Sequence, residues 1–539
     1  MVEALDGNSI GGLLIDVFGA DMTAASSTCG TCGTVRPVAE LVVYRRAPGT
    51  VVRCRTCGSV LMVFVEVREV TCVDLAGLAS LSQTGPVLPK NGTRGGHCAR
   101  TSEQESAEEM STPNEGAMMQ PPQGQMMQPP QGEMHPGGHL YMQTNETRNC
   151  IIHYLRAPDG KITEVERVFT GGAGSGVYKP VSGQASAPNA FEGAFSVILT
   201  PDRRFLFATN GGDNSVSSFN VSQDGKLTLV DAKRTGNVVD GRSGTAKALA
   251  YSPSHRTLFV LHAFGDHLRL MSVDEEGNLT ARTERYTVNT MEWPNRLATM
   301  AALTADEKFL VVGTTFDEPA KTNPDGTPIL WIEKNGAPHL IASNAPDPIG
   351  LIVFPVGAYG ALGEPKFQDG GGGSPWNVQF LRHRPDTFVL GYAVGDGLTL
   401  GTIDEDGTIS VGPIAQFDTS PGKPAELCWL SITSDDRLAF GTIFGYGYVT
   451  SYRIDGNILS IAKDPACPKV PGDGTFRGLD GIVTSGPSDS WLSPDDAYLY
   501  QIYGNASKLV GYAVQPDGSL DEITSAPIPY NSPQGLAGF

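Results

Sequence analysis

Residues 195–233, FSVILTPDRRFLFATNGGDNSVSSFNVSQDGKLTLVDAK, decide the fold, because most of the chain repeats this pattern with variation. The stretch predicts four short strands, since apolar and polar residues alternate in FSVIL, FLFATN, SVSSFNV and KLTLVDA. Asp224-Gly225 lies between the last two runs and favours a tight two-residue turn with positive φ. Four consecutive antiparallel strands of this length form one blade of a β-propeller.

The turn between the third and fourth strands can be counted along the chain. Its copies centre on Gly160, Gly225, Gly277, Gly336, Gly407, Gly456 and Gly518. A spacing of about 50 to 70 residues fits blades whose loops vary in length. The sequence therefore predicts an all-β fold, with a seven-bladed β-propeller over residues 138–539.

The first repeat lacks an inner strand of its own. HLYMQTN at 139–145 matches the second strand of the repeat, and no earlier segment after residue 83 supplies the strand before it. The C-terminal segment SPQGLAGF, residues 532–539, has the pattern of an inner strand. We therefore predict that this segment completes the first blade and closes the ring.

Composition narrows the classes of function. The net charge of −19 over 539 residues disfavours the nucleic-acid backbone as the main partner. The N-terminus carries acidic residues before its apolar part and has no basic region, so it does not read as a signal peptide. No apolar run approaches the length of a transmembrane helix. Nine cysteines, five without a pairing pattern, favour a reducing compartment, and we predict a cytoplasmic protein.

Residues 1–83 are predicted to form a separate module around two CxxC motifs. The motifs are CGTCG, with Cys29 and Cys32, and CRTCG, with Cys54 and Cys57, and 21 residues separate them. Two such turns present four thiolates in the arrangement of a zinc ribbon, and a site closed by four cysteines indicates a structural zinc. Two disulfides, or free thiols, are the alternatives.

The four arginines around the second motif allow two interpretations. Arg45, Arg46, Arg53 and Arg55 could contact nucleic acid or form a solvated rim, and the rim is favoured. We therefore expect no nucleic-acid or membrane partner, while the module leaves room for a protein partner.

Residues 84–137 read as a disordered linker rich in proline, glutamine and methionine. The segment contains the repeat MMQPPQGQMMQPPQGEM at 118–134. Such a composition cannot bury enough apolar surface to fold by itself.

The N-terminal module resembles a family of short, uncharacterised bacterial proteins. The likeness rests on the opening LDGN at 5–8, on Phe18-Gly19, on DMT at 21–23 and on the paired CxxC motifs. The resemblance supports the zinc interpretation and brings no function with it.

The propeller resembles the lactonase family of seven-bladed propellers, which includes 6-phosphogluconolactonases and carboxymuconate cyclases. The likeness rests on repeats of the form TPD.R.LFATN…NSVS.F.V..DG.LTL and is strongest at 193–237, 424–463 and 486–524. It implies a hydrolase that opens a lactone, or an enzyme that forms one.

The motifs that mark activity in that family are not intact in this chain. GTAKALAYS at 244–252 stands where a His-x-His is expected, and LHAFGDH at 261–267 replaces an Asp-Leu-Gly-x-Asp. GPSDSWLS at 486–493 stands where a Pro-Arg-His is expected. The resemblance therefore supports the fold more strongly than it supports the family's enzymatic activity.

A site is expected on one rim of the ring, where inner strands start and second strands end. A rim with cations among carboxylates suits a small anionic lactone or organic acid, because arginine holds a carboxylate with two hydrogen bonds. A carboxylate or histidine can move a proton. The expected catalytic residues are Glu192, His262 and Glu426, and the expected substrate-binding residues are Arg242, Lys247, Arg296, Asn377, Arg477 and Asp489.

Each of these residues also has a structural interpretation. Polar groups line a wet channel without any catalytic role, and His262 could be a hydrogen-bonded core histidine. The sequence thus supports two hypotheses of function. The first is a lactonase-like enzyme, and the second is a non-catalytic propeller that serves as a binding or assembly platform.

Overall fold

The protein divides into two compact units, Met1–Met127 and Gln128–Phe539, each considered separately below. The predicted linker at 84–137 lies outside the described residues, apart from its last residue, Gly137. The computed structural model describes residues 5–18, 22–46, 49–67, 70–75, 77–82, 137–176, 194–237, 246–263, 265–294, 296–318, 330–332, 338–340, 343–345, 347, 349–371, 373–393, 395, 397–416, 426–474, 483–530 and 534–539.

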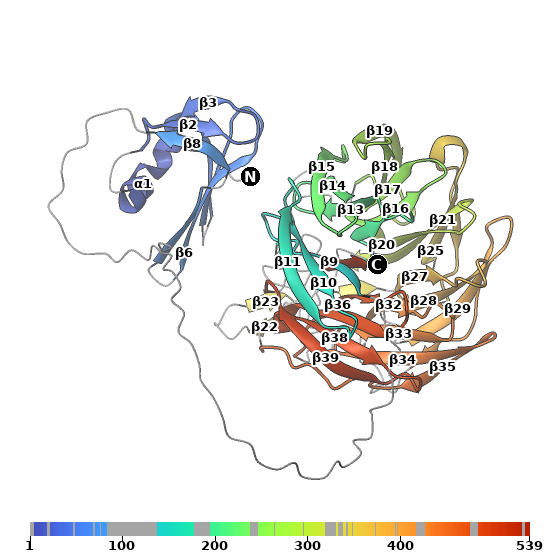
Figure 1. The fold of residues 1–539 in the computed structure, drawn as a ribbon. Coiled ribbons are helices and arrows are strands. Elements are labelled where there is room, and N and C mark those ends of the chain that lie inside the picture. The colour runs from blue at the N-terminus through green and yellow to red at the C-terminus, as the bar shows by residue number, and fades with distance from the viewer. Residues whose placement is uncertain are drawn as a thin grey trace, which may run out of the picture. The chain divides into compact units, whose positions relative to one another are not determined.

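The N-terminal unit combines two small sheets with one short α-helix and two 3-10 turns (Figure 1). The larger sheet has the strand order β1-β4-β5-β6-β7 and the smaller one β3-β2-β8. The helical segments are η1 (Gly7–Ile10), α1 (Gly11–Phe18) and η2 (Val38–Glu40). The strands are β1 (Leu5–Asp6), β2 (Ser26–Cys29), β3 (Val35–Pro37), β4 (Val42–Arg46), β5 (Gly49–Arg53), β6 (Val60–Val67), β7 (Val70–Asp74) and β8 (Leu78–Ser82).

The core of this unit is small and includes two of the CxxC cysteines. Leu14 of α1 packs with Val43, Val52 and other apolar residues of the larger sheet, and Cys29 and Cys54 belong to the same cluster. Apolar packing therefore fixes one cysteine of each motif.

The C-terminal unit is the predicted propeller, with seven antiparallel sheets arranged around an axis (Figure 1). Blade 1 contains β9 (Gly138–Gln143), β10 (Cys150–Arg156), β11 (Ile162–Phe169) and β40 (Gln534–Gly538). Blade 2 contains β12 (Val197–Leu199), β13 (Phe205–Asn210), β14 (Ser215–Val221) and β15 (Leu227–Arg234). Blade 3 contains β16 (Ala246–Ser252), β17 (Thr257–His262), β18 (Leu268–Val273) and β19 (Leu279–Tyr286).

Blade 4 contains β20 (Arg296–Leu303), β21 (Phe309–Glu318), β25 (Leu351–Pro355) and β26 (Lys366–Gln368), and β24 (Ser343–Ala345) also pairs with β21. Blade 5 contains β27 (Pro375–Phe380), β28 (Thr387–Tyr392), β29 (Gly397–Ile403) and β30 (Ile409–Val411), with β31 (Ala415–Gln416) beside β29. Blade 6 contains β32 (Leu427–Ile432), β33 (Leu438–Ile443), β34 (Tyr448–Asp455) and β35 (Ile458–Lys463). Blade 7 contains β36 (Pro487–Leu492), β37 (Tyr498–Tyr503), β38 (Lys508–Val514) and β39 (Leu520–Pro527).

One of the seven predicted hairpins does not belong to a blade. The turn at Gly336 was expected to join the third and fourth strands of blade 4, but its flanks form a separate ribbon of β22 (Leu330–Ile332) and β23 (Pro338–Leu340). Blade 4 instead connects β25 to β26 through the short helix η3 (Ala358–Gly360). The expectation for Gly336 was therefore wrong, because an inserted segment contains a hairpin of its own.

The predicted ring closure is confirmed. β40 pairs antiparallel with β9, with Gln534 opposite Gln143 and Gly538 opposite Leu140. Figure 1 shows the C-terminus at the middle of the ring beside β9. The last strand of the chain is thus the inner strand of the first blade.

The core lies mainly between neighbouring blades. At the closure, Leu140 and Tyr154 of blade 1 pack against Tyr500 and Leu509 of blade 7. Within the described residues, the helices are all too short or too polar to cross a membrane.

Candidate functional site

The four cysteines of the CxxC motifs come together in the N-terminal unit. Their Sγ atoms all lie within 4.8 Å of one another. The Sγ atoms of Cys29 and Cys57 are 3.7 Å apart, and so are those of Cys32 and Cys54. A tetrahedral metal ion with metal–sulfur bonds of about 2.3 Å would separate its sulfurs by about 3.8 Å, so the two 3.7 Å spacings fit a tetrahedral metal site.

Both motifs adopt the same turn, which explains why the four sulfurs converge. The N–H of Gly33 donates to the carbonyl of Cys29, and the N–H of Gly58 donates to that of Cys54, both at 2.9 Å. Both glycines have positive φ, which this turn requires. Each motif therefore buries its first cysteine and exposes its second.

Cys29 and Cys32 differ in acidity. Burial raises the pKa of Cys29 to about 11, whereas the hydroxyl of Thr34 lowers the pKa of exposed Cys32 to about 6. A cation among the sulfurs would favour the thiolate form of all four. The donor set therefore fits a metal ion.

The arginines near the second motif are partly engaged within the unit. Arg53 Nη1 donates to the carbonyl of Gly58 at 3.0 Å, and Arg55 Nε donates to that of Glu40 at 3.0 Å. The side chains of Arg45 and Arg46 lie outside the described residues. For Arg53 and Arg55, the contacts support the turn of the motif.

In the propeller, six of the seven inner strands carry a bulge near their start. The shifted positions are Lys247, Thr299, Trp376, Cys428, Ser488 with Asp489, and Gly535. A bulge re-aims the side chain of the extra residue and often lies next to a binding site. Three of the predicted substrate-binding residues, Lys247, Asn377 and Asp489, lie at or next to these bulges.

Part of the rim is apolar, in contrast to the expected polar mouth. Phe195 before β12, Ala263 after β17 and Phe444 after β33 belong to one cluster with Trp376 and Trp429. The indoles of Trp376 and Trp429 meet edge to face with centroids 6.4 Å apart. The rim therefore contains an apolar group to which blades 2, 3, 5 and 6 contribute.

His262 is fully buried at the end of β17. Its Nε2 lies 2.9 Å from Thr235 Oγ1, and Nδ1 has no hydrogen-bond partner among the described residues. Burial, with the nearby charges of His267 and Arg269, lowers the pKa of His262 to about 3. The imidazole is thus neutral at physiological pH, and its Nδ1 makes no hydrogen bond within the described residues.

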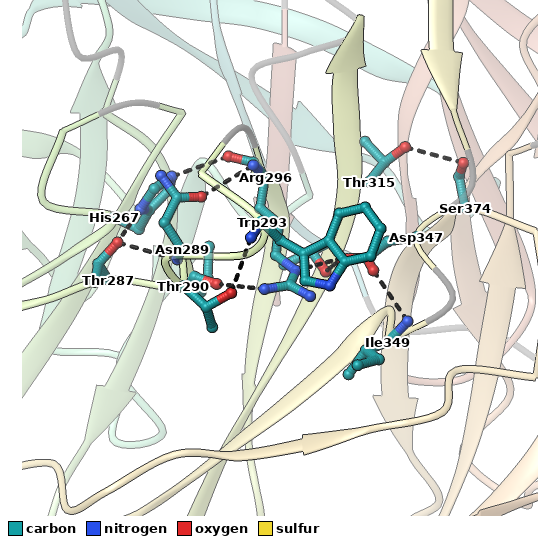
Figure 2. A network of polar contacts seen from close by, with 12 residues as sticks. His267, Thr287, Asn289, Thr290, Trp293, Arg296, Thr315, Asp347, Ile349 and Ser374 are labelled. Carbon is teal, nitrogen blue, oxygen red and sulfur yellow. Dashed lines mark hydrogen bonds and ion pairs between the residues drawn. The ribbon is translucent and has the colours of Figure 1, made fainter.

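Arg296, the first residue of β20, forms a buried ion pair (Figure 2). Its Nε donates to Asp347 Oδ2 at 2.6 Å, and neither side chain is exposed to solvent. Asp347 also accepts from Thr314 Oγ1 at 2.8 Å and from the N–H of Ile349 at 2.9 Å. Asp347 therefore neutralises the arginine that was expected to hold the acid group of a substrate.

His267 joins this network from blade 3. Its Nε2 lies 3.1 Å from the carbonyl of Arg296, and its Nδ1 lies 3.0 Å from Thr287 Oγ1 (Figure 2). Burial lowers the pKa of His267 to about 4, and the positive charge of Lys247 contributes. Lys247 is itself buried, and its Nζ lies 5.8 Å from the centroid of Trp376. Blades 3 to 5 thus gather two neutral imidazoles and two cations.

Asn377, Glu426 and Asp489 lie at the starts of the inner strands of blades 5, 6 and 7. Asn377 is buried, and its Oδ1 has no partner among the described residues. Glu426 precedes β32 with φ of 60°. Asp489 accepts from the N–H groups of Ser490 and Leu536 at 3.0 Å, and burial raises its pKa to about 7. Glu192, Arg242 and Arg477 lie outside the described residues.

Sequence reasoning missed Asp347 and His267. Asp347 lies in the segment NAPDPIG, where a loop carboxylate gives no local sign of a partner 51 residues earlier. His267 ends the stretch LHAFGDH, and a second histidine so close to His262 was the available signal.

Comparison with known families finds a match in each unit. The sequence model of the lactonase seven-bladed β-propeller family matches residues 128–296. The model of DUF6510, a family of unknown function, matches residues 1–86. Both resemblances inferred from the sequence are thereby confirmed. Among curated protein sequences, none matches this chain.

Solved structures share the propeller fold at low sequence identity. A protein from Lactobacillus plantarum is 12% identical with a TM-score of 0.51, and the match covers 75% of this chain and 100% of that one. The periplasmic gluconolactonase of Pseudomonas aeruginosa is 14% identical with a TM-score of 0.48 over 75% and 99% of the two chains. A candidate 6-phosphogluconolactonase of Bacteroides fragilis is 12% identical with a TM-score of 0.49 over 76% and 100%. The first of these likenesses shows the fold alone.

Proposed function

We propose that the propeller is a lactonase-like enzyme that acts on a small anionic lactone or organic acid at the rim of blades 3 to 5. The observation that carries the proposal is the buried group formed by Lys247, His262, His267 and Arg296. A lysine charge attracts a carboxylate or phosphate group, and a neutral imidazole can take a proton from water. The match of residues 128–296 to the lactonase family supports this class of substrate.

The residues divide into binding and proton-transfer roles under this proposal. Lys247 binds the anionic group of the substrate, and Trp376 offers an apolar face beside it. His262 Nδ1 accepts the proton of the water that attacks the lactone carbonyl, and it returns this proton to the ring oxygen as the acyl C–O bond of the lactone breaks. Because His262 is fully buried, the substrate must displace part of the rim to reach it.

The test is turnover of a panel of sugar-acid and muconate lactones by the full chain. Lys247→Met should raise KM more than it lowers kcat, and His262→Gln should lower kcat. His383→Gln, at an exposed turn after β27, is the matched control and should behave like the parent. Absence of turnover of every lactone by the parent protein would refute the enzyme.

A second candidate function is a non-catalytic binding platform. One observation favours it: Arg296 and Asp489 are buried and already bonded within the protein. A platform of this kind would bind a small anion or a protein partner and leave it unchanged. Binding in a thermal-shift screen of lactones and organic acids, together with no turnover, would support the platform over the enzyme.

We also propose that Cys29, Cys32, Cys54 and Cys57 hold a structural zinc. The support is the sulfur spacing, together with a core too small to stabilise such a unit comfortably without a metal. Elemental analysis should find one zinc per chain, and a chelator should unfold this unit while the propeller stays folded. Protein without zinc or iron and with four reactive thiols would overturn the proposal.

A further inference from the structure

Two histidines and a glutamate form a chain of contacts across blade 1. His139 Nδ1 of β9 lies 2.9 Å from His153 Nε2 of β10, and His153 Nδ1 lies 3.1 Å from Glu166 Oε1 of β11. The same Glu166 oxygen accepts from the N–H of Leu227 in blade 2 at 2.8 Å. The chain therefore crosses three strands of one blade and ends on the next.

His139 also holds the strand that closes the ring. Its N–H donates to the carbonyl of Phe539 at 2.8 Å, and the N–H of Phe539 donates to its carbonyl at 3.0 Å. The two rings meet with centroids 4.8 Å apart. On the blade 2 side, the His139 ring lies against Gly225, where a Cβ would be 2.3 Å from Nδ1. The orientation of this imidazole thus affects the closing strand and the contact with blade 2.

The geometry limits how many protons the chain can carry. His153 donates to Glu166 through Nδ1, so its Nε2 accepts the hydrogen of His139 Nδ1 when both rings are neutral. One further proton, on His139 Nε2, leaves this arrangement intact and is balanced by Glu166. A second proton would place two N–H groups face to face at 2.9 Å and two positive charges side by side. The contact must then break.

Charged groups from several elements surround His139, His153 and Glu166 and affect how many protons these side chains can carry. Asp224 and Lys226 act on His153 from the turn of blade 2, and Asp224 and Arg156 act on His139. Tyr141 stacks on His153 and donates to the carbonyl of Gly225 at 2.6 Å. From blade 2, Arg203 lies 5.0 Å from the centroid of the Phe539 ring. Of the groups around the two histidines, Glu166 and Asp224 supply the negative charge that balances a protonated imidazole.

We propose that His139, His153 and Glu166 form a pH-sensitive latch on the closing strand β40. Above the pH at which free histidine is protonated, the chain is intact and the strand is held. Below it, double protonation separates the rings and loosens both β40 and the contact with blade 2.

The direction of the pKa shifts agrees with this geometry. Burial lowers the pKa of His139, with the neighbouring His153 adding to it, and burial lowers that of His153 despite Glu166. An unfolded histidine has a pKa of about 6.5, so below that pH the unfolded state binds more protons than the folded one. The stability of the closure is therefore complete above about pH 6.5 and falls as the pH decreases.

The experiment is hydrogen–deuterium exchange of the full chain between pH 8 and pH 5, followed in the peptide that contains residues 534–539. After correction for intrinsic exchange, the opening constant of this peptide should rise by up to about tenfold per pH unit below pH 6.5. His139→Asn is the decisive variant, because the Asn amide can replace the Nδ1–H donor but cannot take up a proton.

Four outcomes decide the proposal. His139→Asn should keep near-parental protection at pH 8 and lose the rise at low pH, whereas His383→Gln should keep both. If His139→Asn lowers protection at pH 8, Glu166→Gln supplies the test, since removing the charge that balances the first proton should move the rise to higher pH without abolishing strand pairing. Protection of residues 534–539 that is flat from pH 8 to pH 5 in Asp489→Asn, which removes the opposing contribution of Asp489 to the same strand, overturns the latch. So does a His139→Asn variant with the parental pH dependence.

Discussion

Blades 1 and 4 both break the rule that a blade is made from four consecutive strands, and they repair the break differently. Blade 1 takes its inner strand from the far end of the chain, since β40 pairs with β9. Blade 4 keeps its order but admits a long segment between β21 and β25. In each of these blades, one strand pairs with a strand that lies far earlier in the sequence.

The repair in blade 4 relies on a fixed charge pair. Asp347, at the end of the inserted segment, binds Arg296 of β20 and Thr314 of β21 just before β25 begins. An arginine remains protonated at any physiological pH. The segment is therefore held to the sheet by a buried contact between two side chains of opposite charge.

The repair in blade 1 relies on two histidines and a glutamate. His139, His153 and Glu166 stand beside the closing strand where blade 4 has arginine and aspartate. Histidine is the side chain whose charge changes between pH 5 and 8. The ring therefore has a permanent joint, the Arg296–Asp347 pair of blade 4, and a conditional joint, the closing strand β40 beside the histidines of blade 1.

The largest effect is expected from removing the conditional joint altogether. Deleting residues 534–539 leaves β9 as an open edge and should cost more than about 5 kcal/mol, the lower end of the stability of a typical domain. Chemical denaturation and light scattering would show early unfolding and aggregation. A truncated protein that melts like the full chain would mean that β40 contributes little to the closed ring.

The next largest effect concerns the permanent joint. Asp347→Ala leaves the Arg296 guanidinium buried without its carboxylate and should destabilise the propeller by about 3–5 kcal/mol. The double variant Arg296→Met, Asp347→Leu should recover much of that loss, since it removes both charges. Denaturant midpoints would measure both. Equal losses in the single and double variants would contradict an energetic role for the charge.

A smaller effect is expected from two glycine substitutions, which together distinguish steric contact with His139 from the cost of positive φ. Gly225→Ala places a methyl group 2.3 Å from His139 Nδ1, whereas Gly456→Ala, in the matching turn of blade 6, meets nothing within 4 Å. Both glycines have positive φ, which costs an alanine about 1–2 kcal/mol. Gly225→Ala should cost about 1–3 kcal/mol more, because the His139 ring must move. Equal denaturant midpoints for the two variants would show that the ring yields freely.

The smallest effect is a second pH dependence on the same strand. Asp489 accepts from the N–H of Leu536 in β40, and burial raises its pKa to about 7, above its unfolded value. Its contribution is therefore present at acid pH and is lost as the pH rises through about 7, opposite to the histidines. Asp489→Asn should remove this loss, by about 1 kcal/mol between pH 6 and 7. A parent and variant with parallel pH profiles would show that Asp489 does not titrate in this range.

Local sequence patterns predicted the blades and the cysteine cluster. Asp224-Gly225 specifies its turn through two residues, and each CxxC motif specifies its turn through four, so the signal lies within one element. Gly336 shows the limit of such signals, because a hairpin pattern does not reveal which sheet it joins. Its ribbon lies in an insertion rather than in blade 4.

The rim could not be read in the same way, because its properties depend on contacts between blades. Lys247 and Trp376 meet across blades 3 and 5, and the spacing of 129 residues carries no pattern. Arg296 looked available for a ligand until Asp347 was placed beside it. The alternation of apolar and polar residues predicts where a residue lies on its strand. Its contact partner in another blade depends on how the blades pack in the closed ring.

The distance along the chain between β9 and β40 has a consequence for synthesis on the ribosome. About 390 residues separate the two strands, so at about 5–20 residues per second β9 waits roughly 20–80 s for its partner. During that time blade 1 presents an unpaired edge to other nascent chains. Cells that make this protein quickly and at high density would therefore need a chaperone to shield β9 until the last strand emerges.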